Sequence, residues 1–181
     1  MLKKWTTLSR KVVTENKYWS YILDKFEIAG VSRGEYHFVH TGGSTMIIPI
    51  TSSNKILLVN QYRYLNDRES LEFPCGSIQN NISPKENAIK ELREETGYSC
   101  KQINIIGEFS PYSGVSDEMC SVFLAIQLFE SPLPSDTTED FELSEYSIAE
   151  IDDLIKDGTI WDGMSIAAWH LSREQAINLT K

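Results

Sequence analysis

The sequence predicts an α/β fold in which helices cover both faces of a mixed β-sheet. Strand-like apolar runs recur along the chain, segments with clear helix caps lie between and after them, and 41% of the 181 residues are hydrophobic. A chain of this length and composition can form a well-packed globular core. Because strands and helices occur at set places along one chain, we expect them to stack as an α/β/α sandwich.

Several runs have the β-branched and aromatic content that is typical of strands. They cover residues 18–28, 35–40, 45–50, 56–64, 102–109 and 120–129. The first two lie in a β-rich N-terminal extension, residues 1–45, which precedes a core domain at residues 46–181.

A helix is predicted over residues 84–96. Ser83 and Glu86 form a capping box at its start, with Pro84 at the first helical position. Gly97 can adopt the left-handed conformation that ends a helix.

Two further helices are predicted toward the C-terminus, at about 148–157 and about 164–178. Ser147 and Glu150 form a second capping box, and Gly158 is placed to end the first of these helices.

The 84–96 helix has two different faces. Its apolar residues recur at the spacing of a core-facing stripe: Ala88, Ile89 and Leu92. Glu91, Glu94 and Glu95 share another surface, because they are spaced i, i+3 and i+4.

Carboxylates in the last half of a helix oppose its dipole and repel one another. One interpretation of these glutamates is a solvated acidic face. The other is a metal site, because a bound divalent cation removes both penalties. Ligands that offer only oxygen atoms suit Mg²⁺ or Mn²⁺. The wider motif around the helix favours the metal site.

Residues 76–98 resemble the signature of the Nudix hydrolases, G-x5-E-x7-R-E-U-x-E-E-x-G-U, in which U is a bulky aliphatic or aromatic residue. Every spacing is kept, but Ile82 stands where the family has Glu, and Lys90 where it has Arg. The resemblance implies the Nudix fold. It also implies a magnesium-dependent hydrolase that acts on a nucleoside diphosphate linked to another group.

The resemblance implies roles for single residues. Glu91 and Glu95 match the glutamates that hold metal in the family, and Glu94 is a third candidate, both as a ligand and in catalysis. The backbone carbonyl of Cys75 would join them in relatives that cleave ADP-ribose. Gly76 would let the backbone approach the ions without a Cβ in the way.

The two departures bear on that site. In the family, the Arg and Glu at these positions help to position the metal-binding carboxylates. Lys90 keeps the charge but not a bidentate fork, and Ile82 cannot replace a carboxylate. Either the two changes compensate each other or the affinity for metal is weakened.

The segment before the motif resembles the ADP-ribose and nucleotide-sugar pyrophosphatases. Residues 61–63, Gln-Tyr-Arg, match a motif whose arginine contacts the phosphates or the distal sugar. The resemblance therefore implies a substrate contact for Arg63, with Arg68 and Glu72 as weaker candidates.

The segment after the motif points to the same branch. Residues 110–118 resemble an S-P-G-x-S-x-E loop that contacts the nucleotide, which implies substrate contacts for Ser113, Gly114 and Glu118. Ser113 stands where ADP-ribose enzymes typically have Pro, so GDP-mannose and other nucleotide sugars stay open as substrates.

In this branch the residue that places the attacking water lies on a mobile acidic loop. Residues 131–142 match that loop, and their length and Pro, Ser and Thr content suit a lid. Glu139 is the first candidate for the catalytic acid and Glu142 the second.

The N-terminal strands of such relatives pack across a twofold axis, and their aromatic residues can stack on the base. The resemblance therefore implies a homodimer. It also makes Trp19 a candidate substrate contact, with Tyr18 and Tyr36 as alternatives. The other outcome for these aromatic side chains is packing in the core.

The composition limits the partners and the compartment. A net charge of −9 and a pI of about 4.8 argue against a nucleic-acid or membrane-surface partner. The 3 cysteines contain no C-x-x-C pair, which suggests a reducing compartment. No apolar run has the length of a membrane span, so the cytoplasm is expected.

The predicted function is hydrolysis of the pyrophosphate bond of a nucleoside diphosphate sugar, such as ADP-ribose or GDP-mannose. The products would be a nucleoside monophosphate and a sugar phosphate, with Mg²⁺ as cofactor and Mn²⁺ as a substitute. The alternative is a sensor that binds a nucleotide sugar without turnover, which the changes at Ile82 and Lys90 would fit.

Overall fold

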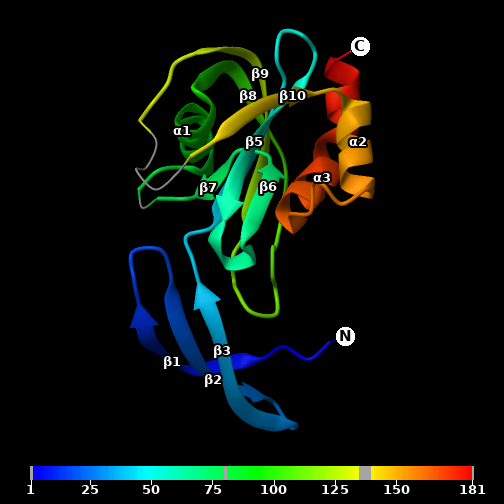
Figure 1. Cartoon of the computed structure of the whole chain (residues 1–181). Helices are drawn as coiled ribbons and strands as arrows, with labels where there is room; N and C mark the ends of the chain where they lie inside the picture. Colours follow the sequence, from blue (N-terminus) through cyan, green and yellow to red (C-terminus); the bar gives the residue numbers. More distant parts are fainter. Residues whose placement is uncertain (1, 80, 135–139, 181) are drawn as a thin grey trace. The chain divides into compact units, whose positions relative to one another are not determined.

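The computed structural model describes residues 2–79, 81–134 and 140–180. It divides into two compact units (Figure 1). The N-terminal unit comprises Met1–Gly43 and Ser110–Met119, and the core unit comprises Ser44–Phe109 and Cys120–Lys181. The change of unit after Gly43 lies close to the predicted boundary between residues 45 and 46, whereas the segment 110–119 joins the N-terminal strands.

The N-terminal unit is an antiparallel sheet in the order β1-β2-β3. Its strands are β1 (Thr6–Glu15), β2 (Ser20–Ile28) and β3 (Ser32–His40). Strand β1 is an additional strand that the pattern did not predict, because all of its residues are exposed and no apolar face marks it. Segment 110–119 attaches through a bridge between Val39 and Ser116 and through a contact of 2.8 Å between His40 Nδ1 and Asp117 Oδ2.

The core unit contains a mixed four-stranded sheet in the order β7-β4-β9-β8. Its strands are β4 (Ser44–Pro49), β7 (Cys75–Ser77), β8 (Tyr98–Phe109) and β9 (Cys120–Glu130). Strands β4 and β9 are parallel, and the other pairs are antiparallel.

A second, antiparallel sheet has the order β10-β5-β6. It is built from β5 (Ile56–Arg63), β6 (Arg68–Glu72) and β10 (Glu142–Tyr146), with the 3₁₀ turn η1 (Tyr64–Asn66) between β5 and β6. Residues 131–142 were expected to form a loop, but Glu142 opens β10, opposite Asn60 of β5. Strand β10 was missed because its side chains are only partly buried and show no apolar alternation.

Helices lie on both faces of the mixed sheet, so the predicted α/β/α sandwich is confirmed (Figure 1). They are α1 (Pro84–Thr96), α2 (Ile148–Lys156) and α3 (Gly163–Leu179). Alternation along β4 sends Ile47 into the apolar cluster under α1. Met46 and Ile48 point into the larger cluster shared with α2 and α3. Because both faces of β4 are buried, the sequence of this strand has no alternating polar side chains.

The helix boundaries follow the predicted caps. Both capping boxes are present, with Ser83 and Ser147 accepting hydrogen bonds from the backbone at the third helical position. Gly97 has φ 76° and ends α1 in the left-handed conformation. The start of α3 uses a cap that was not predicted, since Asp162 accepts a hydrogen bond of 2.7 Å from Ser165 N.

None of the helices in the described part of the chain combines the length and apolar character that crossing a membrane requires.

Helices α2 and α3 are joined by a carboxylate on α2. Asp152 accepts a hydrogen bond of 2.9 Å from Trp169 Nε1 and bonds of 2.6–3.0 Å from the Arg173 guanidinium. The Arg173 guanidinium outweighs the opposing effect of burial and holds the pKa of Asp152 below its ordinary value.

Asp152→Asn should therefore lower the free energy of unfolding at pH 7 by about 1 kcal/mol. A lowered pKa in the folded state stabilises above the ordinary Asp pKa near 4, and this contribution is lost as the pH falls through the folded value. Urea denaturation should therefore show a larger difference from wild type at pH 7 than at pH 3.

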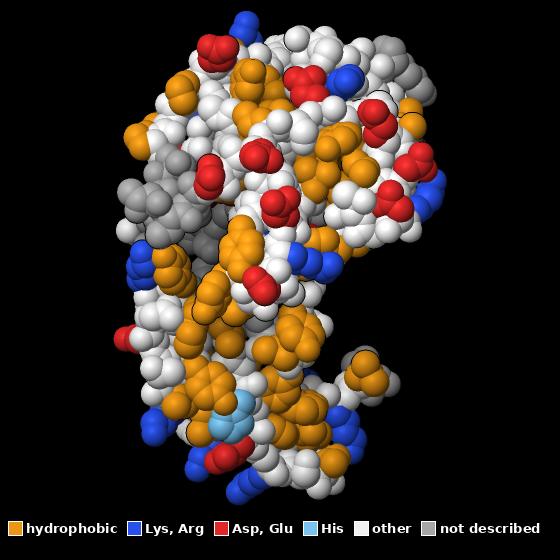
Figure 2. Space-filling view, viewed as in Figure 1, with side chains coloured by type: hydrophobic (Ala, Val, Ile, Leu, Met, Phe, Trp, Pro, Cys, Tyr) orange, Lys and Arg blue, Asp and Glu red, His pale blue; other side chains and the backbone are white. Residues whose placement is uncertain are grey.

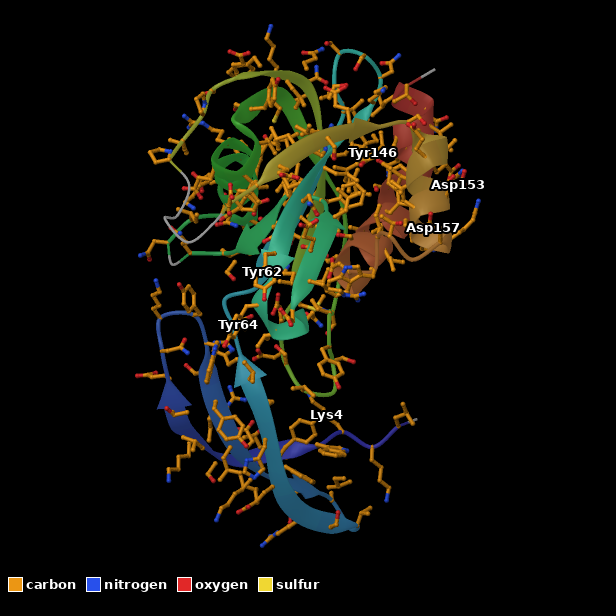
Figure 3. The ribbon with its side chains drawn as sticks, in the orientation of Figure 1. Lys4, Tyr62, Tyr64, Tyr146, Asp153 and Asp157 are labelled. Atoms are coloured by element: carbon orange, nitrogen blue, oxygen red, sulfur yellow. The ribbon has the colours of Figure 1, made fainter. Side chains whose placement is uncertain are left out.

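Asp153→Asn is the matched control, because Asp153 and Asp157 lie on the solvent side of α2 (Figure 3). The Asp153 carboxylate is 75% exposed and pairs with the exposed Lys156, so this variant should change stability little. An equal loss of stability in the two variants would contradict the role assigned to Asp152.

Candidate active site

One stripe of α1 faces β7 with polar side chains. Asn87, Glu91 and Glu95 follow one another at intervals of four residues, and each contacts the backbone of Cys75 or Gly76. Glu91 is 9% exposed and Glu95 7%. These two carboxylates are therefore buried, which contradicts the interpretation as a solvated acidic face.

Gly76 makes room for Glu91. A Cβ built on Gly76 would overlap the Glu91 carboxylate, so the carboxylate occupies the space that any other side chain at position 76 would fill. Gly76 was predicted to let the backbone approach bound ions, and in the structure the group that lies against it is the Glu91 carboxylate of α1.

Glu95 is tied to the same strand one turn later. Its Oε2 accepts a hydrogen bond of 3.2 Å from the backbone N of Cys75. The thiol of Cys75 hydrogen-bonds to Cys120 and is buried near Glu95, and these surroundings raise the pKa of Cys75 well above its ordinary value. A neutral thiol next to the carboxylates adds no further negative charge.

Lys90 supplies the positive charge at this site. Its Nζ forms ion pairs with Glu94 and, at 3.5 Å, with Glu91. Burial disfavours the ammonium, but the bonds and charges of these glutamates outweigh it and raise the pKa of Lys90. The lysine thus keeps the charge of the family's arginine, while the half-buried Ile82 provides no carboxylate.

The oxygen atoms that α1 offers at this site are the type of ligand that a hard divalent cation prefers. Glu91, Glu94 and Glu95 offer carboxylate oxygens only, and Gly76 leaves the approach to Glu91 free of a Cβ. Across residues 2–79, 81–134 and 140–180, no three His, Cys, Asp or Glu side chains already converge for an ion. Cation binding would therefore require the carboxylates to turn, and Lys90 holds two of them.

Arg63 and Glu72, both predicted to contact substrate, bind each other. The Arg63 guanidinium donates two hydrogen bonds to the Glu72 carboxylate, one of them 2.8 Å long. Glu72 is 1% exposed, so the Arg63 guanidinium is needed to stabilise its carboxylate in the charged form. The bond to Glu72 outweighs the burial of Arg63 and raises the pKa of its guanidinium.

Arg68 has a partner that the sequence did not indicate. Its guanidinium carbon lies 3.7 Å from the centre of the Trp161 ring, and Trp161 Nε1 donates a hydrogen bond of 3.1 Å to Glu69 O. A single tryptophan in the loop between α2 and α3 carries no pattern that would have predicted this contact.

Tyr62 and Tyr64 lie at the turn between β5 and β6 (Figure 3). The Tyr62 hydroxyl donates a hydrogen bond of 2.7 Å to Asp67 Oδ1, while Tyr64 is 83% exposed. Arg63 and Arg68 therefore lie on either side of the η1 turn, which carries the exposed Tyr64.

The remaining described candidates belong to the N-terminal unit. Gly114 O accepts a hydrogen bond of 3.1 Å from the Tyr36 hydroxyl, and Ser113 lines a cavity of about 240 Å³ together with Tyr36. Glu118 N donates to Ser116 Oγ at 3.0 Å. Trp19 is 40% exposed. Figure 2 shows hydrophobic side chains gathered over this unit.

The two candidates for the catalytic acid differ in what the structure shows. Glu139 lies outside the described residues. Glu142 is exposed at the start of β10. The assignment of the acid that places the water therefore stays a prediction.

Arg63→Ala should leave the buried Glu72 carboxylate unpaired and lower the free energy of unfolding by about 3–5 kcal/mol. The double variant Arg63→Leu/Glu72→Leu should recover most of that loss, because no buried charge remains. Urea denaturation measures both. A stable Arg63→Ala protein would show that Glu72 does not depend on Arg63, and Arg68→Ala is the control at a more exposed arginine.

Gly76→Ala should keep the fold but displace the Glu91 carboxylate, since the far end of a flexible side chain can move. The free energy of unfolding should change by less than about 1 kcal/mol, and the affinity for Mn²⁺ should fall at least about tenfold. Gly163→Ala is the matched control, because a Cβ there meets no atom within 4 Å. Unchanged Mn²⁺ binding in Gly76→Ala would contradict the role of Glu91.

Comparison with known proteins places this site in a family. The NUDIX domain matches residues 40–168. A methanol dehydrogenase activator of Bacillus methanolicus is 30% identical over 158 residues, which cover 86% of this chain and 85% of the relative. An ADP-ribose pyrophosphatase of Bacillus subtilis (strain 168) is 26% identical over 178 residues, which cover 97% and 96% of the two chains.

A solved structure shares the fold. The crystal structure of an ADP compounds hydrolase matches with a TM-score of 0.87 at 23% identity, and the match covers 99% of this chain and 97% of the other. The NUDIX match spans well over half of the chain and includes both Gly76 and the glutamates of α1. The chain therefore belongs to the Nudix hydrolase family.

Proposed function

We propose that this protein hydrolyses the pyrophosphate bond of a nucleoside diphosphate sugar with the help of Mg²⁺. ADP-ribose is the first substrate to test, because the relative from Bacillus subtilis is named for it. GDP-mannose and UDP-glucose are further members of the class. The products are a nucleoside monophosphate and a sugar phosphate.

The observation that carries this proposal is the docking of Glu91 and Glu95 against the backbone of Cys75 and Gly76. Buried carboxylates are costly unless a cation or a hydrogen-bond donor compensates them. Lys90 and the Cys75 backbone N–H are among the groups that compensate this charge. A divalent cation held by Glu91 and Glu95, with Glu94 as a third ligand, would add positive charge at the same carboxylates.

Bound there, Mg²⁺ would supply positive charge that offsets the negative oxygens of the diphosphate. The chain's own residues do the remaining work. Glu91 and Glu95 fix the position of the site on α1, and Gly76 keeps the approach open. We assign the proton of the attacking water to an acid after β9, Glu139 first and Glu142, at the start of β10, second.

The Arg68 guanidinium is the arginine best suited to a substrate phosphate. Its central carbon lies 3.7 Å from the centre of the Trp161 ring, a contact that orients it without using its N–H groups as a carboxylate would. Arg63 is committed to Glu72 instead, and supports the strand pair that carries Arg68. We also propose a homodimer formed through the N-terminal strands.

The second candidate is a sensor that binds a nucleotide sugar without cleaving it. It is favoured by Lys90, which occupies two of the glutamates that a cation would need, and by Ile82, which offers no carboxylate in return. Both candidates require binding of the nucleotide sugar, and only turnover separates them.

Wild-type protein with Mg²⁺ should release a nucleoside monophosphate from at least one of ADP-ribose, GDP-mannose and UDP-glucose. Glu95→Gln should lower that turnover at least about tenfold, because it removes a metal ligand. Glu174→Gln, an exposed change on α3, is the control and should leave turnover unchanged.

Chromatographic detection of the products decides between the candidates. Binding without product would favour the sensor. Activity confined to nucleoside triphosphates would contradict the substrate class, and full activity of Glu95→Gln would contradict the site.

A further inference from the structure

Asn87 is a polar residue at a position where α1 is fully buried. It is 0% exposed, like its neighbour Ala88, which belongs to the apolar cluster under the helix. Its Nδ2 donates to Thr45 Oγ1 at 2.9 Å and to Gly76 O at 3.3 Å. Among the described residues, its Oδ1 is buried without a hydrogen-bond partner.

Stability alone does not account for an asparagine here. A buried acceptor without a partner is destabilising, and asparagine is among the weaker helix formers. An alanine at this position would avoid both costs, as Ala88 does one residue later. The benefit of Asn87 must lie in its two donated hydrogen bonds.

Those bonds join α1 to two strands at one point. Thr45 of β4 and Gly76 of β7 are register partners in the sheet, and the Asn87 amide donates to both. One helical turn later, the Glu91 carboxylate packs against the same Gly76. Asn87 therefore fixes the backbone on which Glu91 rests.

We propose that Asn87 is a positioning residue for the cation site. By holding Gly76 O against α1, it sets the distance between the glycine and the Glu91 carboxylate, and so sets the affinity for the divalent cation. This inference rests on the proposed function, in which Glu91 is a metal ligand.

The residue type fits this role. Aspartate has the same shape but no N–H donor, and it would place another buried charge one turn from Glu91. Serine is too short to reach Gly76 O while it remains in the helix, where its hydroxyl bonds to the preceding turn. Among small side chains, only the asparagine amide offers two donors from one atom.

The test measures cation binding without substrate. Mn²⁺ is titrated into wild type, Asn87→Ala and Thr45→Val, and the free ion is followed by electron paramagnetic resonance. Thermal unfolding of the three proteins is measured without metal. Asn87→Ala should weaken Mn²⁺ binding about tenfold or more, while its unfolding temperature stays the same or rises because the unpaired oxygen is gone.

Thr45→Val is the matched control, because it removes the other acceptor and keeps the bond to Gly76. Its Mn²⁺ affinity should equal that of wild type. Equal weakening in both variants would show that general packing matters instead of the Gly76 bond, which would overturn the proposal.

Other results of the same experiment would overturn either the positioning role of Asn87 or the metal site. Wild-type Mn²⁺ affinity in folded Asn87→Ala overturns the positioning role, as does a large fall in unfolding temperature without a change in binding. If Asn87→Ala does not fold, Asn87→Ser takes its place in the titration, since it also loses the bond to Gly76. A wild-type protein that binds no Mn²⁺ would overturn the metal site itself, and with it the proposed function.

Discussion

The contact between the Glu91 carboxylate and the backbone of Gly76 is the constraint on which the rest of the site depends. It requires a glycine on β7, a glutamate on α1 and a helix that lies close to the strand. The apolar side of α1, which packs Ala88 and Leu92 under β4, brings the helix that close. The core packing and the polar stripe are thus two consequences of one helix orientation.

Burial of acidic side chains at this contact gives the site its electrostatic character. Glu91 and Glu95 are nearly enclosed, and Lys90 and the backbone N of Cys75 are among the groups that compensate their charge. The lysine is a point charge on a flexible stem, so it can leave the glutamates more easily than a bidentate arginine could. In the proposed enzyme, Lys90 and a divalent cation are alternative partners for the same carboxylates.

Two arginines that were both predicted to contact substrate have different partners in the structure. Arg63 neutralises the buried Glu72 and so allows β5 and β6 to pair around a charge. Arg68 lies over the Trp161 ring, and in the proposed enzyme its guanidinium contacts a substrate phosphate. A sequence motif records that an arginine is needed at a position, whereas its partner depends on which strands and loops surround it.

The sequence by itself determined the three helices and the more apolar strands: the caps at Ser83 and Ser147, the end of α1 at Gly97, and the apolar runs of β4 and β9. These features are local or periodic, so neighbouring residues encode them. Strands β1, β6, β7 and β10 were not predicted. Only the tertiary structure decided that Asn87 joins Thr45 to Gly76, that Arg63 binds Glu72, and that Trp161 supports Arg68. Such contacts join side chains far apart in the chain, and their geometry exists only once the sheet register and the helix packing bring them together.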